Sequence, residues 1–312
     1  MLIVFGAIAM ELHVPVNKFP STGITATASD YTLNAGGKGA NQAFAATRSG
    51  AKVALIGKTG IDDYSKRILD KVRREGVVTS GVGKSDDLHT GLDIISHHEV
   101  SGEMQQIKSP GANAEADNEQ APDEILGKGN IILTQSDLDM KQNLELLKRA
   151  KDLGATTMMN LSPSINITQE ILNNLDYLIV NSKEANKFAK KMNLPLEGNS
   201  KKIAQALSQI GKLTCIITMG EKGSVAYTPE NKGYNTPALK LENFVDHHGA
   251  EDAFCGTFAA CIHNNTPLSG ALRRASIAAS LACEAKGGQD SFPYLADINA
   301  KLEELGDVAT ED

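Results

Sequence analysis

Residues 246–256 have the types and spacing of an anion-binding turn that leads into a helix. Gly249 allows the turn a backbone conformation that residues with a Cβ avoid, and the small and apolar residues from Ala250 onward predict a buried helix. A helix start carries unpaired N–H groups and a partial positive charge, which suit an anion. Asp252 follows in the first turn, where a carboxylate could accept a proton from a hydroxyl during phosphate transfer. An Asp that only caps the helix is the alternative.

A second glycine-rich stretch, residues 34–41, precedes a helix predicted over residues 42–49. Glycines before a helix let backbone amides approach a ligand closely. The stretch matches neither the G-x-x-x-x-G-K-[ST] phosphate loop nor the G-x-G-x-x-G dinucleotide fingerprint. Without such a fingerprint, a nicotinamide-dependent enzyme is the weaker hypothesis, which fluorescence quenching with NADH would test.

From residue 130 onward, apolar strands alternate with helices, which predicts a doubly wound, mainly parallel sheet with helices on both faces. Ligands bind such sheets at the carboxyl ends of the strands. The strands predicted at 131–134, 156–160, 177–180 and 214–219 each have a polar residue at or just after that end. These residues are Asp137, Asn160, Asn181 and Thr218.

The composition describes a globular chain that could bury a full core: 312 residues, 41% hydrophobic and 22% charged. The net charge of −7, the absence of Trp and the 4% aromatic content argue against a nucleic-acid partner. No apolar run is long enough for a membrane helix. The apolar start lacks a basic segment and is broken by Glu11, so we expect a first strand instead of a signal peptide. Four dispersed cysteines predict free thiols in the cytoplasm.

Residues 246–256 resemble the signature D-T-x-G-A-G-D-x-F-x-G of the ribokinase (PfkB-type) family of carbohydrate kinases, and G-G-K-G-A-N at 36–41 resembles the family's N-terminal motif. The resemblance extends from Leu2 to about Leu305. It implies a single ribokinase-like α/β domain over residues 1–312, with a small β-sheet lid formed by about 12–33 and 91–108. The hairpin at 91–108 is expected to turn at residues 101–102, and the lid to join two copies into a homodimer.

The resemblance also implies the reaction and the residues that take part. The γ-phosphoryl of ATP would move to a hydroxymethyl group of a small sugar (pentose or hexose) or a nucleoside, with Asp252 as base and the turn at Gly249, Ala250 and Glu251 stabilising charge. The residues implied for the acceptor are Glu11, Gly37, Lys38, Asn41 and Asp137. Those implied for the nucleotide are Asn181, Glu184, Thr218, Gly220, Gly223 and Gly249. Glu184 would hold Mg²⁺ through water, and Asp246 and Ser291 would hold K⁺.

The acceptor pocket departs from ribokinase itself in its first strand-turn and after the central strand. Ala9 and Glu11 stand where that enzyme aligns Asn and Asp, and Asp137 stands in place of a Glu. Because a site built to hydrogen-bond one hydroxyl rejects analogues that lack it, ribose, another pentose, a hexose and a nucleoside all stay open.

Glu251 is the main departure, because the family has Gly there. A carboxylate about 4 Å from the phosphoryl oxygens would cost about 4 kcal/mol, or roughly three decades in rate. A side chain turned to solvent would cost a decade or less, and a backbone φ suited to Gly would add strain. We expect a slow kinase that Glu251→Gly speeds at least tenfold. A catalytically impaired homologue that binds sugar or nucleotide as a sensor or scaffold is the alternative, which His247 and His248 also favour.

The acidic end of the chain after Gly306 is expected to be frayed.

Overall fold

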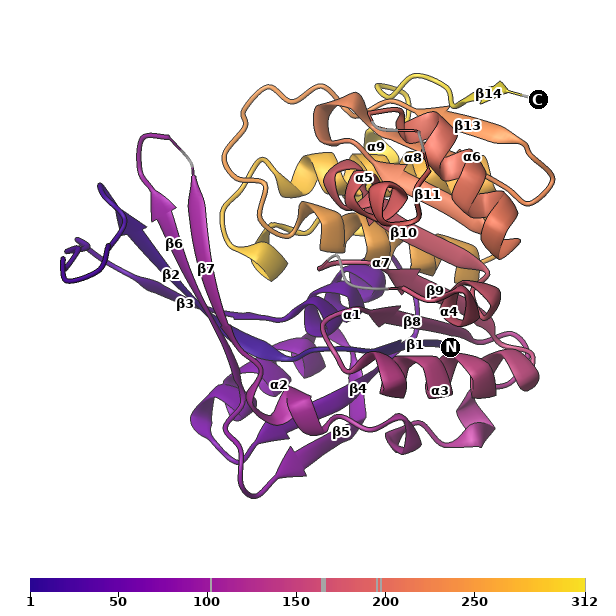
Figure 1. Cartoon of the computed structure of the whole chain (residues 1–312). Coiled ribbons are helices and arrows are strands. Elements are labelled where there is room, and N and C mark those ends of the chain that lie inside the picture. Colours follow the sequence, from indigo (N-terminus) through magenta and orange to yellow (C-terminus); the bar gives the residue numbers. More distant parts are fainter. Residues whose placement is uncertain (102, 164–166, 195, 197, 312) are drawn as a thin grey trace.

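The computed structural model of the protein describes residues 1–101, 103–163, 167–194, 196 and 198–311. Residue 102, at the expected hairpin turn, lies outside these ranges. In them, strands form a large central sheet and a smaller second sheet that projects from it (Figure 1). The large sheet comprises β1 (Leu2–Phe5), β4 (Val53–Gly60), β5 (Val78–Ser85), β8 (Ile131–Gln135), β9 (Thr156–Asn160), β10 (Tyr177–Asn181), β11 (Thr214–Thr218), β12 (Ser224–Tyr227), β13 (Gly233–Thr236) and β14 (Ala309–Glu311).

The large sheet has the order β14-β13-β12-β11-β10-β9-β8-β1-β4-β5. The strands from β5 to β11 pair in parallel, whereas β12, β13 and β14 add as antiparallel strands at one edge. Parallel strands are buried on both faces, so they are continuously apolar. The four residues of β1 are all fully buried, which agrees with the expected first strand.

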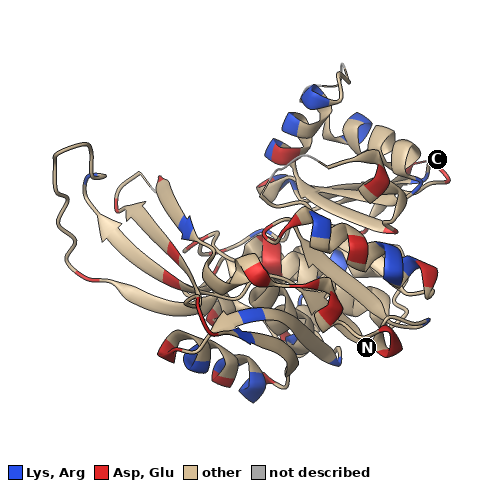
Figure 2. Ribbon diagram, turned by 60° about the horizontal axis from the view of Figure 1, so that its bottom comes forward, with Lys and Arg blue, Asp and Glu red and all other residues tan. Residues whose placement is uncertain are grey.

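Helices cover both faces of the large sheet, as expected for a doubly wound fold (Figure 1). They are α1 (Lys38–Arg48), α2 (Asp63–Glu75), α3 (Met140–Asp152), α4 (Gln169–Asn173), α5 (Ser182–Lys191), α6 (Ser200–Gly211), α7 (Ala250–His263), α8 (Leu268–Ala282) and α9 (Leu295–Ala300). Successive residues of a strand point to opposite faces. Leu2 and Val4 share a core with α1, α2, α7 and α8, and Ile3 and Phe5 share one with α3. Basic and acidic side chains are interspersed along the helices (Figure 2).

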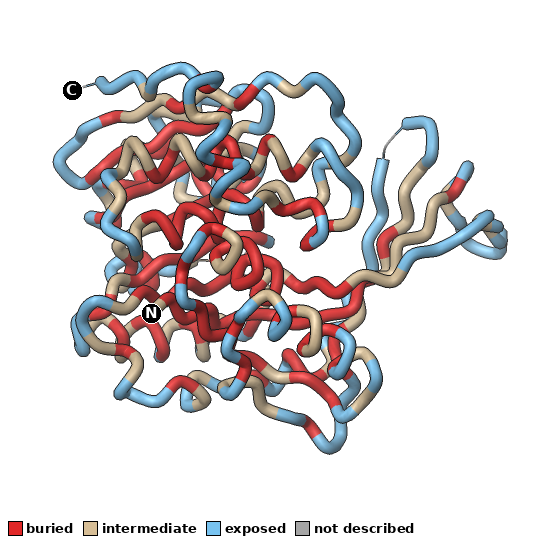
Figure 3. The backbone as a smooth tube through the Cα atoms, turned by 180° about the vertical axis from the view of Figure 1, so that it is seen from behind, coloured by how far each residue is buried: buried red, intermediate tan, exposed pale blue. Residues whose placement is uncertain are grey.

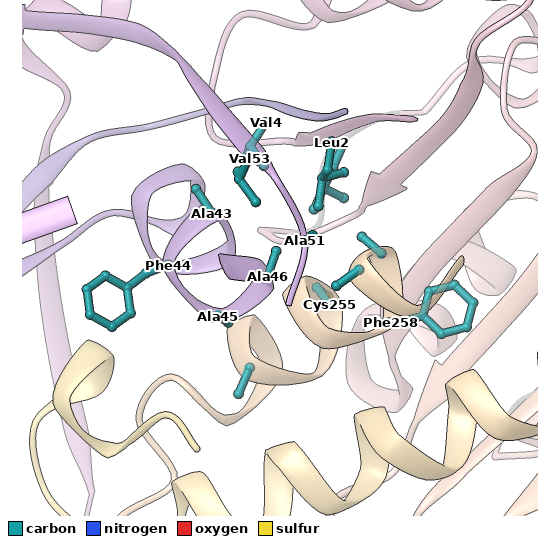
Figure 4. Packing of buried hydrophobic residues seen from close by; sticks show 14 of the residues in the cluster. Leu2, Val4, Ala43, Phe44, Ala45, Ala46, Ala51, Val53, Cys255 and Phe258 are labelled. Atoms are coloured by element: carbon teal, nitrogen blue, oxygen red, sulfur yellow. The ribbon is translucent and has the colours of Figure 1, made fainter. Parts of the chain in front are cut away.

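Helices α1 and α7 pack unusually closely, and this contact assembles the site described below (Figure 4). A Cβ at Gly256 of α7 would lie 2.5 Å from the carbonyl oxygen of Gln42 and 2.7 Å from Cβ of Ala45, both in α1. Only glycine leaves room for this approach. Residues of the first turn of α1 and of α7, far apart in the sequence, are therefore held side by side.

The second sheet has the order β3-β2-β6-β7 and projects from one end of the molecule (Figure 1). Its strands are β2 (Ala9–Val16), β3 (Thr32–Gly36), β6 (Gly91–His98) and β7 (Met104–Ser109). We call this sheet the lid. Its outer part is mostly exposed or half-buried (Figure 3). The large apolar side chains exposed in or near it are Ile24, Tyr31, Val100, Met104 and Ile107.

Two expectations about local structure were wrong. Helix α1 begins at Lys38, four residues before the expected start, because the N–H of Asn41 already bonds to the carbonyl oxygen of Gly37 (2.9 Å). The N–H of Ala40 bonds to the carbonyl oxygen of Ala7 (3.2 Å), two residues after β1. The acidic end is not frayed over residues 309–311, because β14 pairs with the open edge of β13. None of the helices that the structure describes is long and apolar enough to cross a membrane.

Candidate active site

Asp252 lies in the first turn of α7, where the sequence placed it. The positive φ of 80° falls on Gly249, and the helix begins at Ala250. The Asp252 carboxylate is buried and accepts hydrogen bonds from Asn41 Nδ2 (3.0 Å) and Gln42 Nε2 (2.9 Å). Lys38 Nζ lies 3.9 Å from its Oδ1. Three side chains from the start of α1 thus surround one carboxylate from α7.

A chain of amide side chains fixes the orientation of Asn41 and Gln42. Gln289 Nε2 donates to Asn41 Oδ1 (3.0 Å), and Gln135 Nε2 donates to Gln42 Oε1 (2.8 Å). Because each amide oxygen already accepts a hydrogen bond, each NH₂ group is turned toward the carboxylate. Gln42 also donates to Asn160 Oδ1 (3.0 Å). The Asp252 carboxylate is therefore held from two sides.

Glu251 points toward the carboxyl ends of two strands. Asn160 Nδ2 donates to its Oε1 (2.9 Å), and Asn181 Nδ2 lies 3.5 Å from its Oε2. The side chain is not turned out to solvent. The expected backbone strain was also wrong, because Glu251 is the second residue of α7 and the turn's positive φ is taken by Gly249.

Glu184 lies in the first turn of α5, behind the N-cap Asn181, whose Oδ1 accepts a hydrogen bond from the Glu184 N–H (2.9 Å). Burial raises the pKa of Glu184 to about 7, and the negative charge of Glu251 adds to this rise. Its Oε2 is buried without a hydrogen-bond partner among the residues that the structure describes. The two neighbouring carboxylates therefore form a place where a cation would be stabilised.

Lys38 is the positive charge closest to these carboxylates. Burial alone would lower the pKa of its ammonium, but Asp252, then Glu251 and Asp137, hold that pKa well above its usual range. Lys38 is therefore charged at neutral pH and could form charge-assisted hydrogen bonds with an anion.

A cavity of about 1010 Å³ extends from the start of α7 to the turn after β11. Thr218, Gly220 and Gly223 of the turn after β11 line it, and so does Glu251 of α7. Helix α8 supplies Ser276, Ala279 and Ser280 to another wall. Of the residues predicted for the nucleotide, Thr218, Gly220 and Gly223 line this cavity. Gly249 directly precedes the lining residue Ala250. Asn181 and Glu184 lie next to Glu251 and are not part of the lining.

Glu11 lies where β2 meets the start of α1. Its Oε1 accepts the N–H of Gly37 (3.3 Å), and its Oε2 lies 2.8 Å from His248 Nε2 and 3.4 Å from His13 Nε2. Burial would raise the pKa of Glu11, but the hydrogen bonds and charges of His13 and His248 hold it well below its usual range. The residues predicted for the acceptor therefore form a continuous row that leads to Asp252: Glu11, Gly37, Lys38 and Asn41.

Asp137 lies after β8 and contacts the lid. Both of its oxygens accept hydrogen bonds from Lys108 Nζ of β7 (3.1 and 3.3 Å). Asp246 and Ser291, predicted for a monovalent cation, lie in adjoining segments: a Cβ at Gly249 would lie 3.3 Å from Gly288 Cα. Asp246 Oδ1 accepts the N–H of His248 (3.0 Å), and Ser291 Oγ donates to the carbonyl oxygen of Gly288 (2.8 Å).

Sequence analysis missed the roles of several residues at this site. Gln42 directly follows the glycine-rich motif, but its contact with Asp252 joins residues 210 positions apart. His13 could have been found, because residues two apart in a strand share a face and Glu11 and His13 are such a pair in β2. Gln135 had no signal beyond its place at the end of a strand.

Comparisons with known proteins agree with this geometry. The family model described as pfkB family carbohydrate kinase matches residues 1–295. Ribokinase from Lactococcus lactis subsp. lactis (strain IL1403) is 30% identical over 305 residues, which cover 97% of each chain. The crystal structure of ribokinase from Thermotoga maritima has a TM-score of 0.88 and 27% identity, with 97% of this chain and 99% of that chain covered. Arabidopsis thaliana ribokinase, complexed with ribose and ATP, has a TM-score of 0.87 and 26% identity, with 97% and 98% covered.

These matches span nearly the whole chain and include both glycine-containing motifs. They confirm the predicted fold, a doubly wound sheet with a small second sheet. The chain belongs to the pfkB family of carbohydrate kinases.

Proposed function

We propose that this protein transfers the γ-phosphoryl group of ATP to a hydroxymethyl group of a small sugar or a nucleoside. The observation that carries the proposal is the buried Asp252 carboxylate, held by Asn41 and Gln42 beside Lys38 at the start of α7. The relatives described above are ribokinases, and the structure of one of them is complexed with ribose and ATP. A pentose is therefore the first acceptor to test, followed by a hexose and a nucleoside.

Asp252 accepts the proton of the attacking hydroxyl in this proposal. A general base must lie within hydrogen-bond reach of the proton, directly or through one water, and the hydrogen bonds from Asn41 and Gln42 orient the Asp252 carboxylate. The first N–H groups of a helix have no intrahelical partner, so the turn at residues 249–252 supplies donors and a positive dipole end to the transferring group. Lys38 adds a full positive charge on the same side. Phosphoryl transfer depends mainly on such positioning and charge stabilisation.

The carboxylates of Glu184 and Glu251 suit the Mg²⁺ that accompanies ATP. The unpartnered Oε2 of Glu184 and the adjacent charge of Glu251 offer hard oxygen donors, and Mg²⁺ binds through one or two carboxylates while retaining waters. Bound Mg²⁺ neutralises charge on the β and γ oxygens. For a monovalent cation such as K⁺, Ser291 Oγ donates its proton to Gly288 and so keeps its lone pairs free, and one oxygen of Asp246 is unengaged by His248.

A second function, sugar or nucleotide binding without turnover, has one observation in its favour. Glu251 stands in the turn that would receive the phosphoryl group, and it is one of the residues that line the cavity. Repulsion there lowers the transfer rate without preventing nucleotide or sugar from binding elsewhere. We favour a slow kinase over this alternative, because Asp252, Lys38 and their amide network are complete.

The experiment is a measurement of acceptor-dependent ADP formation over a panel of pentoses, hexoses and nucleosides. The parent is expected to turn over at least one of them, and Asp252→Asn to lower kcat by about two to four decades with nucleotide affinity unchanged. Thermal melting of the variant verifies that it is folded. No turnover with any acceptor, together with measurable sugar binding, would favour the non-catalytic function. Equal kcat in parent and variant would refute the role of Asp252.

Two further parts of the proposal concern the molecule in the cell. We propose that two copies pair through their lids, because the lid exposes Tyr31, Met104 and Ile107 and is small for an independent sheet. We also propose that the protein works in the cytoplasm, which agrees with its unpaired cysteines at 215, 255, 261 and 283.

A further inference from the structure

Three ionisable side chains from two parts of the molecule meet at the base of the lid. Glu11 and His13 come from β2 of the lid, and His248 comes from the turn before α7. One oxygen of Glu11 and one ring nitrogen of each histidine all lie within 4.8 Å of one another. We propose that Glu11, His13 and His248 form a binding site for a divalent transition-metal ion of the Zn²⁺ class.

The distances suit such an ion. With bonds of about 2.0–2.2 Å, the ligand atoms of tetrahedral Zn²⁺ lie roughly 3.3 Å apart. Glu11 Oε2 is 3.4 Å from His13 Nε2, and 2.8 Å from His248 Nε2. The first separation already matches. The second is that of a hydrogen bond, which lengthens by about half an ångström when a metal replaces the shared proton.

Both ligand-bearing segments are held by further contacts. His13 Nδ1 lies 2.8 Å from His97 Nε2, and the two rings stack at 5.1 Å. Oε1 of Glu11 accepts the N–H of Gly37, and the backbone N–H of His248 bonds to Asp246. A hydrogen bond from the second ring nitrogen, such as that of His13, orients a metal-ligating histidine and strengthens it. His13 therefore has this second layer of contact, whereas His248 is positioned through its backbone.

The donor set favours Zn²⁺ over Mg²⁺. Mg²⁺ prefers oxygen ligands, whereas imidazole suits Zn²⁺, Cu²⁺ and Ni²⁺. Two histidines and one carboxylate leave a fourth position open, as in zinc sites that bind water or substrate. The His13 and His248 side chains are 11% and 19% exposed, so the site is sheltered but reachable. It is separate from the Glu184 and Glu251 carboxylates proposed above for Mg²⁺.

The test uses the full chain after chelator treatment, titrated with Zn²⁺ by calorimetry without nucleotide or sugar. We expect one Zn²⁺ per chain and a melting temperature that rises with Zn²⁺, since a ligand of the folded state stabilises it. His13→Ala and His248→Ala are each expected to weaken binding about 100-fold or more, and His97→Ala about tenfold. His89→Ala is the matched control, because its side chain is 97% exposed and lies outside the cluster.

Two outcomes overturn the proposal: a parent that binds no Zn²⁺, or a parent whose affinity is unchanged in both ligand variants. If an alanine variant does not show a cooperative melt, Glu11→Gln replaces it, because this change keeps the shape of the side chain and removes the charged ligand. Loss of Zn²⁺ binding in a folded Glu11→Gln protein supports the site. Unchanged binding in it refutes the site.

The site also has a consequence that rests on the proposed function. Glu11 is the carboxylate offered to the acceptor, so Zn²⁺ on Glu11 and a sugar hydroxyl compete for it. Saturating Zn²⁺ is expected to weaken binding of the best acceptor at least tenfold in the parent and not in His248→Ala. Acceptor binding that Zn²⁺ leaves unchanged would refute the competition. An acceptor that fails to bind with or without Zn²⁺ would count against the proposed function, and the metal titration would stand unaffected.

Discussion

Glu251 adds a negatively charged side chain to the motif at residues 246–256, at a position where the family has Gly. The family's Gly at this position leaves the helix start open, whereas here Asn160 and Asn181 hold a carboxylate across the ends of β9 and β10. The same carboxylate contributes to the raised pKa of Glu184. Glu251 therefore adds negative charge at the start of α7, where the proposed reaction also brings the negatively charged phosphoryl group.

We expect Glu251→Gly to raise the rate of phosphoryl transfer at least tenfold on the best acceptor. The reason is the removal of charge repulsion, about 4 kcal/mol at roughly 4 Å and intermediate dielectric, which distance and Mg²⁺ reduce. Glu251→Gln is the matched control, because its oxygen still accepts from Asn160 and its backbone is unchanged. Steady-state kinetics of the parent, Glu251→Gly and Glu251→Gln tests whether the charge of Glu251 slows the transfer. Acceleration in both variants identifies charge as the cause, and a fast parent that neither variant improves would contradict the expectation.

Asp93 of β6 provides a pH-dependent test at a second buried carboxyl. Burial raises the pKa of Asp93 to about 6, Lys108 opposes the rise, and Glu11 and Asp137 add to it. An unfolded Asp has a pKa of about 3.9, so the folded protein binds the proton more tightly. As pH rises from about 4 to 6, the free energy of unfolding therefore falls by up to about 3 kcal/mol.

Asp93→Asn removes this loss while keeping the hydrogen bond from Gln106 Nε2, which lies 3.2 Å from the carboxylate. The variant is expected to exceed the parent in stability above about pH 6, by up to about 3 kcal/mol, and to equal it below about pH 4. Urea unfolding at several pH values measures the difference, with the exposed Asp87→Asn as control. A difference that does not vary with pH would disprove the assignment.

Among the elements, the contact between α1 and α7 matters most to the site. It places Asn41 and Gln42 against Asp252, and it depends on the absence of a side chain at Gly256. The sequence predicted both helices and the positions of both motifs. It did not predict their contact, because the pattern of apolar residues defines a buried face but not which helix that face meets.

Gly256→Ala is expected to destabilise the fold by about 1–3 kcal/mol, as overpacking does, despite the better helix propensity of Ala. The new methyl group would lie 2.5 Å from a backbone oxygen of α1, so the helices must separate. We also expect kcat to fall, because the separation moves Asn41 and Gln42 from Asp252. Gly270→Ala in α8 is the control, since its Cβ would meet only the Thr266 methyl group and the end of Arg274. Equal unfolding free energies for parent and Gly256→Ala would contradict this account.

At the scale of the whole molecule, the alternation of strands and helices was sufficient to predict the doubly wound sheet. The same pattern placed polar residues at the strand ends, and the two motifs lie at the starts of α1 and α7. Contacts between segments distant in sequence were not predictable in this way. The pairing of β14 with β13 depends on an open sheet edge that three exposed residues, 309–311, do not reveal. The cluster at His13 and His248 likewise depends on where the lid meets the body.

The lid should behave as an interface or a mobile cover. We expect light scattering to show a dimer, and Ile107→Lys, which places a charge on the exposed apolar face, to shift it toward monomer. Ile61→Lys, at an equally exposed position outside the lid, is the control. Two results together would contradict this prediction for the lid. They are a monomer at all concentrations, and no acceptor-induced protection of residues 91–98 and 104–109 from hydrogen exchange.

The strand order also determines when the molecule becomes complete during synthesis. From β9 to β14 each strand pairs with the one made just before it, so the sheet can extend as the ribosome delivers the chain. The pair Asn41 and Asp252 does not follow that sequence, because it joins residues 211 positions apart. A nascent chain that has already formed most of its sheet therefore still lacks the Asp252 carboxylate, the proton acceptor that we propose. The proposed site is complete only after α7 has emerged and packed on α1.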